Sequence, residues 1–171
     1  NHMTALDNYD RPEVQPTQPV EPYVENAKAN LRVVTDWISA HPDTEFDIFF
    51  PPYSILFWDK VIREGRTEAV FAAIRQAGQT LLQYDNVKFY GYLMDPEIVT
   101  NLDNYCDYIH HSSGVCREIL TMLQREEGRL TEENLEETLA NWREFVVHYD
   151  YDQFWDERFW IQWNAEHAAA P

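Results

Sequence analysis

The sequence predicts an α/β domain with a small, mostly parallel sheet and helices on both faces of that sheet. Two apolar runs of strand length, 46–50 and 87–92, are separated by a long segment with helical periodicity. Strand, helix and strand in this order are typical of parallel strands joined by a crossover. We expect a flavodoxin-like winding. Two strands are few for such a sheet, so the expected fold is partial, with a helix-rich C-terminus.

Composition divides the 171 residues into three parts. Residues 1–22 begin with a cloning remnant at 1–3 and continue as a proline-rich stretch without apolar periodicity, which predicts an extended surface arm. Residues 23–150 hold the α/β domain, which we expect to be truncated at its N-terminal side. Residues 151–171 form an aromatic C-terminal helix or tail.

The first half of the domain begins with a helix over 23–40. Pro22 suits the first turn of that helix, and apolar residues recur at helical spacing on one face, with Trp37 widening the apolar stripe. The run 46–50 is nearly all apolar and is stopped by two prolines, so it is a buried parallel strand. A helical region follows, Gly65 interrupts it, and a long amphipathic helix covers 66–84.

The second half starts with the strand 87–92, whose alternation predicts a strand that is half-exposed or near an edge of the sheet. A short helical turn from Pro96 leads into a loop over 101–111. Ser112 or Ser113 caps the next helix, which runs to about residue 126. Thr131 caps the following helix, whose buried stripe is formed by Leu135, Leu139, Trp142 and Val146.

The loop between the second strand and the next helix holds the one Asp-x-x-His of the sequence, Asp107 and His110. An acid three residues before a histidine on a turn can hold the ring Nδ1–H, fix the tautomer and stabilise the protonated ring. Such a pair supplies the base and the orienting acid of a catalytic triad, whose third member is the nucleophile. The alternative is an Asx turn at Asp107 beside a surface histidine.

The loop after the first strand, Pro51-Pro52-Tyr53-Ser54, is expected at the same edge of the sheet, because the carboxyl ends of parallel strands meet there. Tyr53, Ser54 and His111 are therefore candidates for lining a substrate site. Ser54 is better explained as a helix cap than as a nucleophile, because it lacks the strained turn that exposes a catalytic serine.

The stretch Asp-Tyr-Ile-His-His-Ser-Ser-Gly-Val at 107–115 resembles the last motif block of the SGNH (GDSL-type) hydrolases and their O-acyltransferase relatives. The order of Phe-Phe-Pro-Pro-Tyr-Ser at 49–54 and Asn-Val-Lys-Phe-Tyr at 86–90 extends the likeness over roughly residues 28–126. The resemblance implies that Asp107 and His110 are the catalytic acid and base. No Gly-Asp-Ser block, which carries the nucleophile in that family, occurs in the sequence.

The resemblance therefore implies the C-terminal portion of an esterase or O-acyltransferase that is inactive without a missing nucleophile segment. Its substrate would be an acyl ester or a polysaccharide of the cell envelope. Its location would be extracytoplasmic, through a membrane anchor outside this sequence. The partner would be a second copy or the missing N-terminal half. An incomplete sheet leaves an edge uncovered, and we expect the arm, the tail or a second molecule to cover it.

Composition excludes several classes of partner. A net charge of −17 disfavours nucleic acid and anionic lipid and favours a neutral or cationic substrate, or a basic partner. Cys106 and Cys116 flank the loop without metal-binding spacing, and we expect them to be reduced and half-buried rather than joined in a disulfide. We expect no cofactor and no metal, because adjacent histidines such as His110 and His111 rarely share one ion.

The C-terminal tail suggests the main alternative function. Five large aromatic residues occur within ten positions, with Trp155, Phe159 and Trp163 one helical turn apart. These side chains either pack on the core of the domain or form a partner surface. In the second case the chain is a non-catalytic interaction domain, recognised by an exposed aromatic surface and by a His110 that faces no cleft.

Overall fold

The computed structural model of the chain describes residues 4–167. The helices are α1 (Thr4–Asp7), α2 (Glu21–Ala40), α3 (Ile55–Arg63), α4 (Thr67–Leu81), α5 (Pro96–Val99), α6 (Ser113–Gln124), α7 (Leu135–His148) and α8 (Glu157–His167). Short 3-10 turns occur at η1 (Tyr92–Met94), η2 (Leu102–Asn104) and η3 (Tyr151–Trp155). The strands are β1 (Phe46–Phe49), β2 (Val87–Tyr90) and β3 (Arg129–Leu130). The chain is thus α/β and rich in helix, as predicted.

The three strands form one mixed sheet in the order β1-β2-β3. β1 and β2 are parallel, with Phe46 opposite Val87, which confirms the predicted crossover. β2 and β3 are antiparallel, with Phe89 opposite Leu130, so a mostly parallel sheet is the wrong description. In the described part of the chain β2 is central and mostly buried, and β1 is an edge strand. The prediction that β2 is half-exposed or near an edge is therefore wrong.

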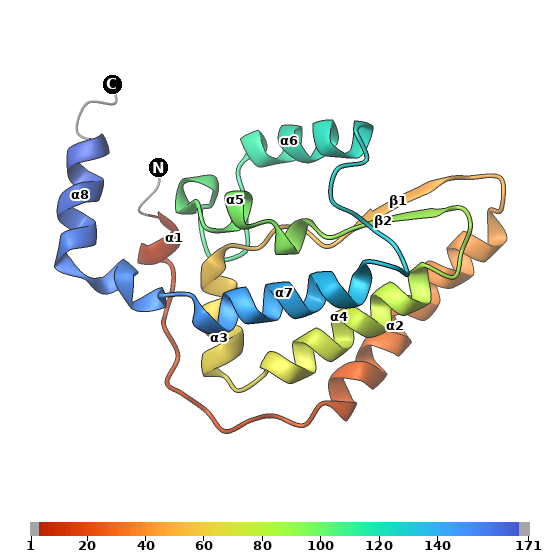
Figure 1. Cartoon of the computed structure of the whole chain (residues 1–171), viewed down its shortest axis with the longest axis horizontal. Helices are drawn as coiled ribbons and strands as arrows, with labels where there is room; N and C mark the ends of the chain where they lie inside the picture. Colours follow the sequence, from red (N-terminus) through yellow and green to blue (C-terminus); the bar gives the residue numbers. More distant parts are fainter. Residues whose placement is uncertain (1–3, 168–171) are drawn as a thin grey trace.

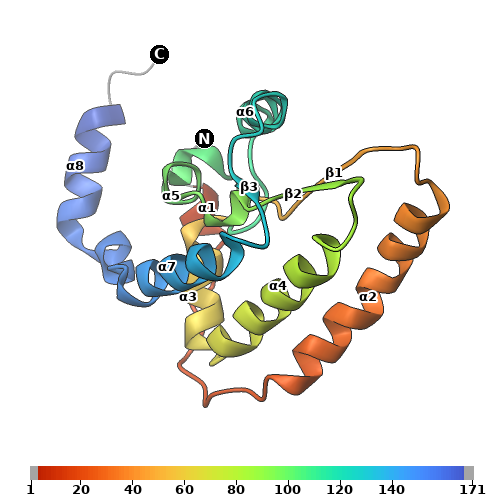
Figure 2. The same ribbon diagram turned by 45° about the vertical axis from the view of Figure 1, so that its right-hand side comes forward.

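Helices cover both faces of the sheet, as Figures 1 and 2 show. On one face α7, α4 and α2 lie side by side in a layer in which α2 is outermost, and α6 lies over the other face (Figure 2). The α6 face encloses a small apolar cluster, in which Tyr90, Tyr92 and Ile98 pack with Val115 and Ile119.

The main core lies between the sheet and the α3, α4 and α7 layer. Trp58 of α3 is fully buried and packs against Phe71 of α4 and Trp142 of α7, with ring centroids 5.2 and 5.9 Å away. All four residues of the predicted apolar stripe of α7 are buried, which confirms that stripe. The helix itself begins later than predicted, because Asn134 exchanges hydrogen bonds with Thr131 and takes the N-cap position.

The predicted apolar stripe of α2 is only partly buried. Pro22 lies in the first turn, as the sequence predicts, but Ile38 is the one buried residue of this 20-residue helix. Trp37 points outward with 64% of its surface exposed, so its placement in the buried stripe is wrong. The reason is visible in Figure 2, where α2 contacts the body of the molecule mainly along α4.

The N-terminal arm is extended over residues 8–19, as predicted, but it begins with the helical turn α1. Ala5 and Tyr9 are buried, so this end of the arm is part of the core. The arm then follows α3, where the backbone N–H of Gln15 donates to the Arg63 carbonyl at 2.6 Å. Both α1 and the tail helix α8 lie at the end of the molecule away from β1 and α2 (Figure 1).

None of the described helices is both long and apolar enough to cross a membrane.

Candidate functional site

The loops after β1 and before α6 meet at one edge of the molecule, which confirms the prediction that they lie together. The backbone N–H and the hydroxyl of Ser54 both donate to the carbonyl oxygen of Tyr108, at 3.2 and 2.8 Å. The hydroxyl of Tyr105 donates to the Pro52 carbonyl at 2.8 Å. These three hydrogen bonds fix the 101–111 loop against the start of α3.

Asp107 and His110 form the predicted hydrogen-bonded pair. The His110 Nδ1 lies 2.5 Å from Asp107 Oδ2, and the other carboxylate oxygen accepts the N–H groups of Ile109 and His110 at 2.8 and 2.7 Å. Partial burial by itself raises the pKa of Asp107. The three hydrogen bonds outweigh burial and hold that pKa below its ordinary value. Asp107 is thus both an Asx-turn residue and the acid that orients the ring.

His110 stands on the surface, because 70% of its side chain is exposed. The geometry suits a proton acceptor whose tautomer is set by Asp107, but the catalytic role of the pair stays a prediction.

Ser54 does not serve this pair as a nucleophile. It is completely buried, and its hydroxyl is engaged with the Tyr108 carbonyl. Ser54 occupies the N-cap position of α3, as predicted, although its side chain makes no capping hydrogen bond.

The other predicted lining residues serve packing and loop structure. The Tyr53 ring lies 4.9 Å from that of Phe57 and is half-buried. His111 forms an isolated β-bridge with Tyr105, and its Nδ1 lies 3.6 Å from the Sγ of Cys116. Their role as substrate-lining residues stays a prediction.

Both cysteines are free thiols and exposed, so the expectation that they are half-buried is wrong. They lie outside the packed core because the loop and the first turn of α6 are at the surface. Among the described residues, no three His, Cys, Asp or Glu side chains come together as a metal site would require.

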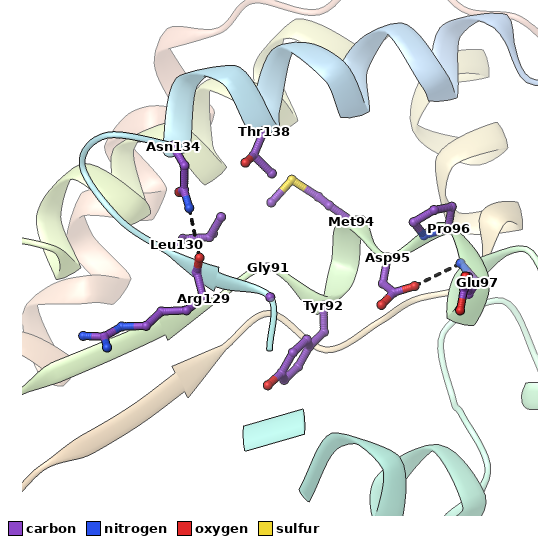
Figure 3. Close-up of a pocket in the computed structure, with 11 residues that line it drawn as sticks. Gly91, Tyr92, Met94, Asp95, Pro96, Glu97, Arg129, Leu130, Asn134 and Thr138 are labelled. Carbon is purple, nitrogen blue, oxygen red and sulfur yellow. Dashed lines mark hydrogen bonds between the residues drawn. The ribbon is translucent and has the colours of Figure 1, made fainter. Parts of the chain in front are cut away.

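A pocket of about 470 Å³ opens where β2 ends, a position that the sequence reasoning missed (Figure 3). Its walls come from η1, the start of α5, β3 and α7. Gly91 lies at its base, Asp95 and Glu97 on one side, and Asn134 and Thr138 of α7 on the other. The sequence could have indicated this pocket only through its position after a predicted strand, since ligand pockets of α/β folds often follow the carboxyl ends of strands.

Several polar groups around the pocket are already used by the backbone. Asp95 Oδ1 accepts from the N–H groups of Glu97 and Ile98 and so caps α5. The Asn134 side-chain amide donates to the Arg129 carbonyl at 3.0 Å. The Arg129 side chain points away from the pocket in Figure 3 and pairs with Glu126 at 2.7 Å. The pocket can hold a small molecule, but these contacts explain its polar residues without one.

A second feature missed by the sequence reasoning is the outer side of α2. Six exposed residues at helical spacing form one uncharged row there, which we call the α2 stripe: Asn26, Ala29, Asn30, Val33, Trp37 and Ala40. Val33 is 69% exposed, more than most apolar side chains of a folded domain. All five charged residues of α2 lie on the adjoining flank: Glu21, Glu25, Lys28, Arg32 and Asp36.

An apolar groove of about 330 Å³ is lined by residues of both α2 and α4, beside the stripe. Its lining includes Leu31 and Val34 of α2, Val70 and Ile74 of α4, and Phe50. The edge strand β1 is joined to α2 by the 41–45 loop and lies on the same side of the molecule (Figure 2). We call the α2 stripe and the outer edge of β1 together the α2–β1 face.

Two curated proteins resemble part of this chain. They are the "UPF0735 ACT domain-containing protein" of Lacticaseibacillus casei (strain BL23) and the protein of the same name from Lacticaseibacillus paracasei (strain ATCC 334). Each is 26% identical over 90 residues, which are 53% of this chain and 62% of the relative. The chain thus spans less than two thirds of the length of these relatives. No family model matches the sequence, and no solved structure matches it.

These relatives correct the resemblance drawn from the loop motif. They are named for an ACT domain, and neither is named as an SGNH hydrolase or acyltransferase. The assignment to the SGNH hydrolases is therefore wrong, and so is the function as the C-terminal portion of an esterase or O-acyltransferase. The physical reason for the error is that one short Asp-x-x-His loop arises readily as an Asx turn, as Asp107 illustrates.

Proposed function

We propose that this chain is a non-catalytic interaction domain that binds a protein partner through the α2–β1 face. The observation that carries the proposal is the exposed, uncharged α2 stripe in a chain with a net charge of −17. Within the stripe, Val33 and Trp37 are large apolar side chains that are 69% and 64% exposed. The usual explanation for neighbouring exposed apolar side chains is a partner that covers them.

The surroundings of His110 support a non-catalytic role. Ser54, which contacts the loop that carries His110, is buried and donates its hydroxyl to the backbone carbonyl of Tyr108. The names of the two relatives describe a domain and state no reaction, which agrees with a binding role.

The aromatic tail is a weaker candidate for the partner surface. Phe154 is buried, and Phe159 packs against the core, with its ring centroid 5.4 Å from that of Phe154. Trp155 is partly exposed, but the Arg11 guanidinium lies 4.2 Å from its ring centroid. The side chain of Trp163 lies outside the described residues. The tail therefore uses much of its aromatic surface within the molecule.

The edge of β1 supports the same face. β1 pairs with β2 on one side, and alternate backbone N–H and C=O groups point to the other side. An edge of this kind can accept a strand from a partner. A flavodoxin-like sheet, as predicted from the sequence, would continue at this position.

Site-specific photo-crosslinking tests the proposal. A benzoylphenylalanine placed at Trp37 should form a covalent adduct with a protein partner, and mass spectrometry should map the adduct to one defined segment. The matched control carries the same group at Leu120, which is 61% exposed on α6, on the other face of the sheet. Adducts at neither position, or equal adducts at both, would contradict a specific interaction through the α2–β1 face.

Esterase activity provides the complementary test. The chain should hydrolyse p-nitrophenyl acetate no faster than an equal concentration of free imidazole, and His110→Ala should leave the Trp37 crosslink unchanged. Turnover that His110→Ala abolishes would refute the non-catalytic assignment.

A further inference from the structure

We propose that the partner on the α2–β1 face is a second copy of this chain, bound through antiparallel pairing of the two α2 helices about a two-fold axis near Val33. This inference rests on the proposed function and names the occupant of the surface described there. A two-fold interface requires one surface that is complementary to itself, and the α2 stripe has that property.

The sizes of the side chains in the stripe match across such an axis. In an antiparallel pair centred on residue 33, each residue of one copy lies opposite a residue of the other copy. The two residues are equally far from residue 33 along the sequence, one before it and one after it. The large Trp37 of one copy then lies opposite the small Ala29 of the other, and Ala40 lies opposite Asn26. Val33 meets its own symmetry mate at the axis. A large side chain opposite a small one allows two helices to approach closely.

The charges on the flank of α2 are also complementary. Lys28, Arg32 and Asp36 occupy the same flank of the helix, one turn apart. About the same axis, Asp36 of each copy falls between Lys28 and Arg32 of the other. α2 carries three acidic and two basic residues, so it is nearly neutral in a strongly acidic chain. Charge on this helix therefore opposes self-association only weakly.

Within residues 4–167, neither the N-terminal arm nor α8 covers this surface. The N-terminal arm follows α3, where the backbone N–H of Gln18 donates to the Gly65 carbonyl at 2.8 Å. α8 lies at the opposite end of the molecule (Figures 1 and 2). α2 is 20 residues long, which is about 30 Å of helix, so the pairing of two such helices together with adjacent loops can approach the area of a standard interface.

Sedimentation and light scattering on the whole chain give the first test. The wild-type chain should be a dimer at micromolar concentration. Val33→Asp should raise the dissociation constant by at least about a hundredfold, because two carboxylates would face each other at the axis. Leu120→Asp adds the same charge on the other face and should leave the dimer intact. A wild-type monomer, or equal effects of both substitutions, would overturn the proposal.

A charge-exchange experiment tests the geometry. Asp36→Arg alone should weaken the dimer at least about tenfold, and so should Lys28→Glu combined with Arg32→Glu. An equimolar mixture of these two variants should form a heterodimer, since every acid then faces a base. The residues are exposed, so circular dichroism should show unchanged folding. No heterodimer from two folded variants would refute the two-fold arrangement.

The crosslinking experiment separates the two proposals. An adduct of Trp37 with a second copy, of twice the chain mass, supports both. An adduct with a different protein would retain the interaction domain and overturn the second copy. The absence of any adduct would overturn both.

Discussion

Asp59 of α3 is the most deeply buried carboxylate among the described residues, and it anchors the N-terminal arm. Only 2% of its surface is exposed. It accepts hydrogen bonds from the Tyr9 hydroxyl at 2.9 Å and from Nε and Nη2 of Arg11 at 3.0 and 3.1 Å. The same guanidinium donates to Asp152 at 2.6 Å, which joins the arm to the η3 segment. One ionic cluster thus joins the N-terminal arm and the η3 segment to α3.

Replacement of Arg11 should be strongly destabilising. Arg11→Ala would leave the buried Asp59 carboxylate with Tyr9 as its remaining hydrogen-bond donor among those the structure records. The free energy of unfolding should fall by about 3 kcal/mol, the usual cost of an uncompensated buried charge. Urea denaturation measures this value. Arg75→Ala, which breaks the exposed pair with Glu136, is the control and should cost less than about 1 kcal/mol. Equal effects of the two substitutions would mean that Asp59 is not buried as described.

The lowered pKa of Asp107 predicts a pH dependence of stability. An acid whose pKa is lower in the folded state than in the unfolded state adds stability above its unfolded value of about 3.9, and that stability is lost as the pH falls. Asp107→Asn should therefore cost about 1 kcal/mol at neutral pH. The difference from wild type should shrink as the pH falls below about 4. Asp43→Asn, in an exposed turn, should show no such change. A difference between Asp107→Asn and wild type that is constant with pH would contradict the pairing with His110.

At the scale of elements, the N-terminal arm packs closely against Gly65 at the end of α3. No other residue can replace this glycine without backbone strain. Gly65 has a φ of +67°, in the left-handed region. A Cβ at this position would lie 2.2 Å from the carbonyl oxygen of Pro16. The arm also accepts a side-chain hydrogen bond there, from Arg63 Nε to the Pro12 carbonyl at 2.5 Å.

Gly65→Ala should detach part of the arm. The positive φ and the close approach of Pro16 together should lower the free energy of unfolding by about 2 kcal/mol. Hydrogen exchange should show faster exchange at Gln15 and Gln18, whose N–H groups bond to Arg63 and Gly65.

The control for this substitution is Gly114→Ala within α6, where the nearest atom to the new Cβ is the Ser112 hydroxyl at 3.3 Å. Its effect on stability should be smaller than about 1 kcal/mol, because a helix favours alanine over glycine. If the backbone amides of the arm exchange no faster in Gly65→Ala than in the wild type, the close packing of the arm on Gly65 is contradicted.

The sequence predicts those elements that have a strong local pattern. The helix stripe of Leu135 and Trp142 and the parallel pairing of 46–50 with 87–92 follow from periodicity and chain order. β3 is not predicted, because its two residues, Arg129 and Leu130, are too few to show a periodic pattern. The antiparallel pairing of β3 depends on tertiary contact alone.

The candidate site is predictable to a similar degree. The spacing of Asp107 and His110 gives their hydrogen bond correctly, because three residues on a turn suffice to form it. The burial of Ser54 is not local, since it depends on Tyr108 from a distant part of the chain. The α2 stripe could have been read from the sequence as an uncharged row at helical spacing. Its exposure could not, because only the packing of α2 on α4 decides which side of the helix faces out.

At the scale of the whole molecule, the net charge of −17 opposes the approach of a second copy. This repulsion acts over distances that salt screens, whereas burial of Val33 and Trp37 does not weaken with salt. Raising the salt concentration from about 50 mM to about 500 mM shortens the screening length roughly threefold and should tighten the proposed dimer severalfold. Sedimentation equilibrium at both concentrations measures the change. The dimer of the Asp36→Arg variant should be weaker than the wild-type dimer, and it should also tighten as salt is added, because the repulsion between two acidic chains remains. A wild-type dimer that dissociates as salt is added would show that the flank charges, and not the uncharged stripe, hold the two copies together.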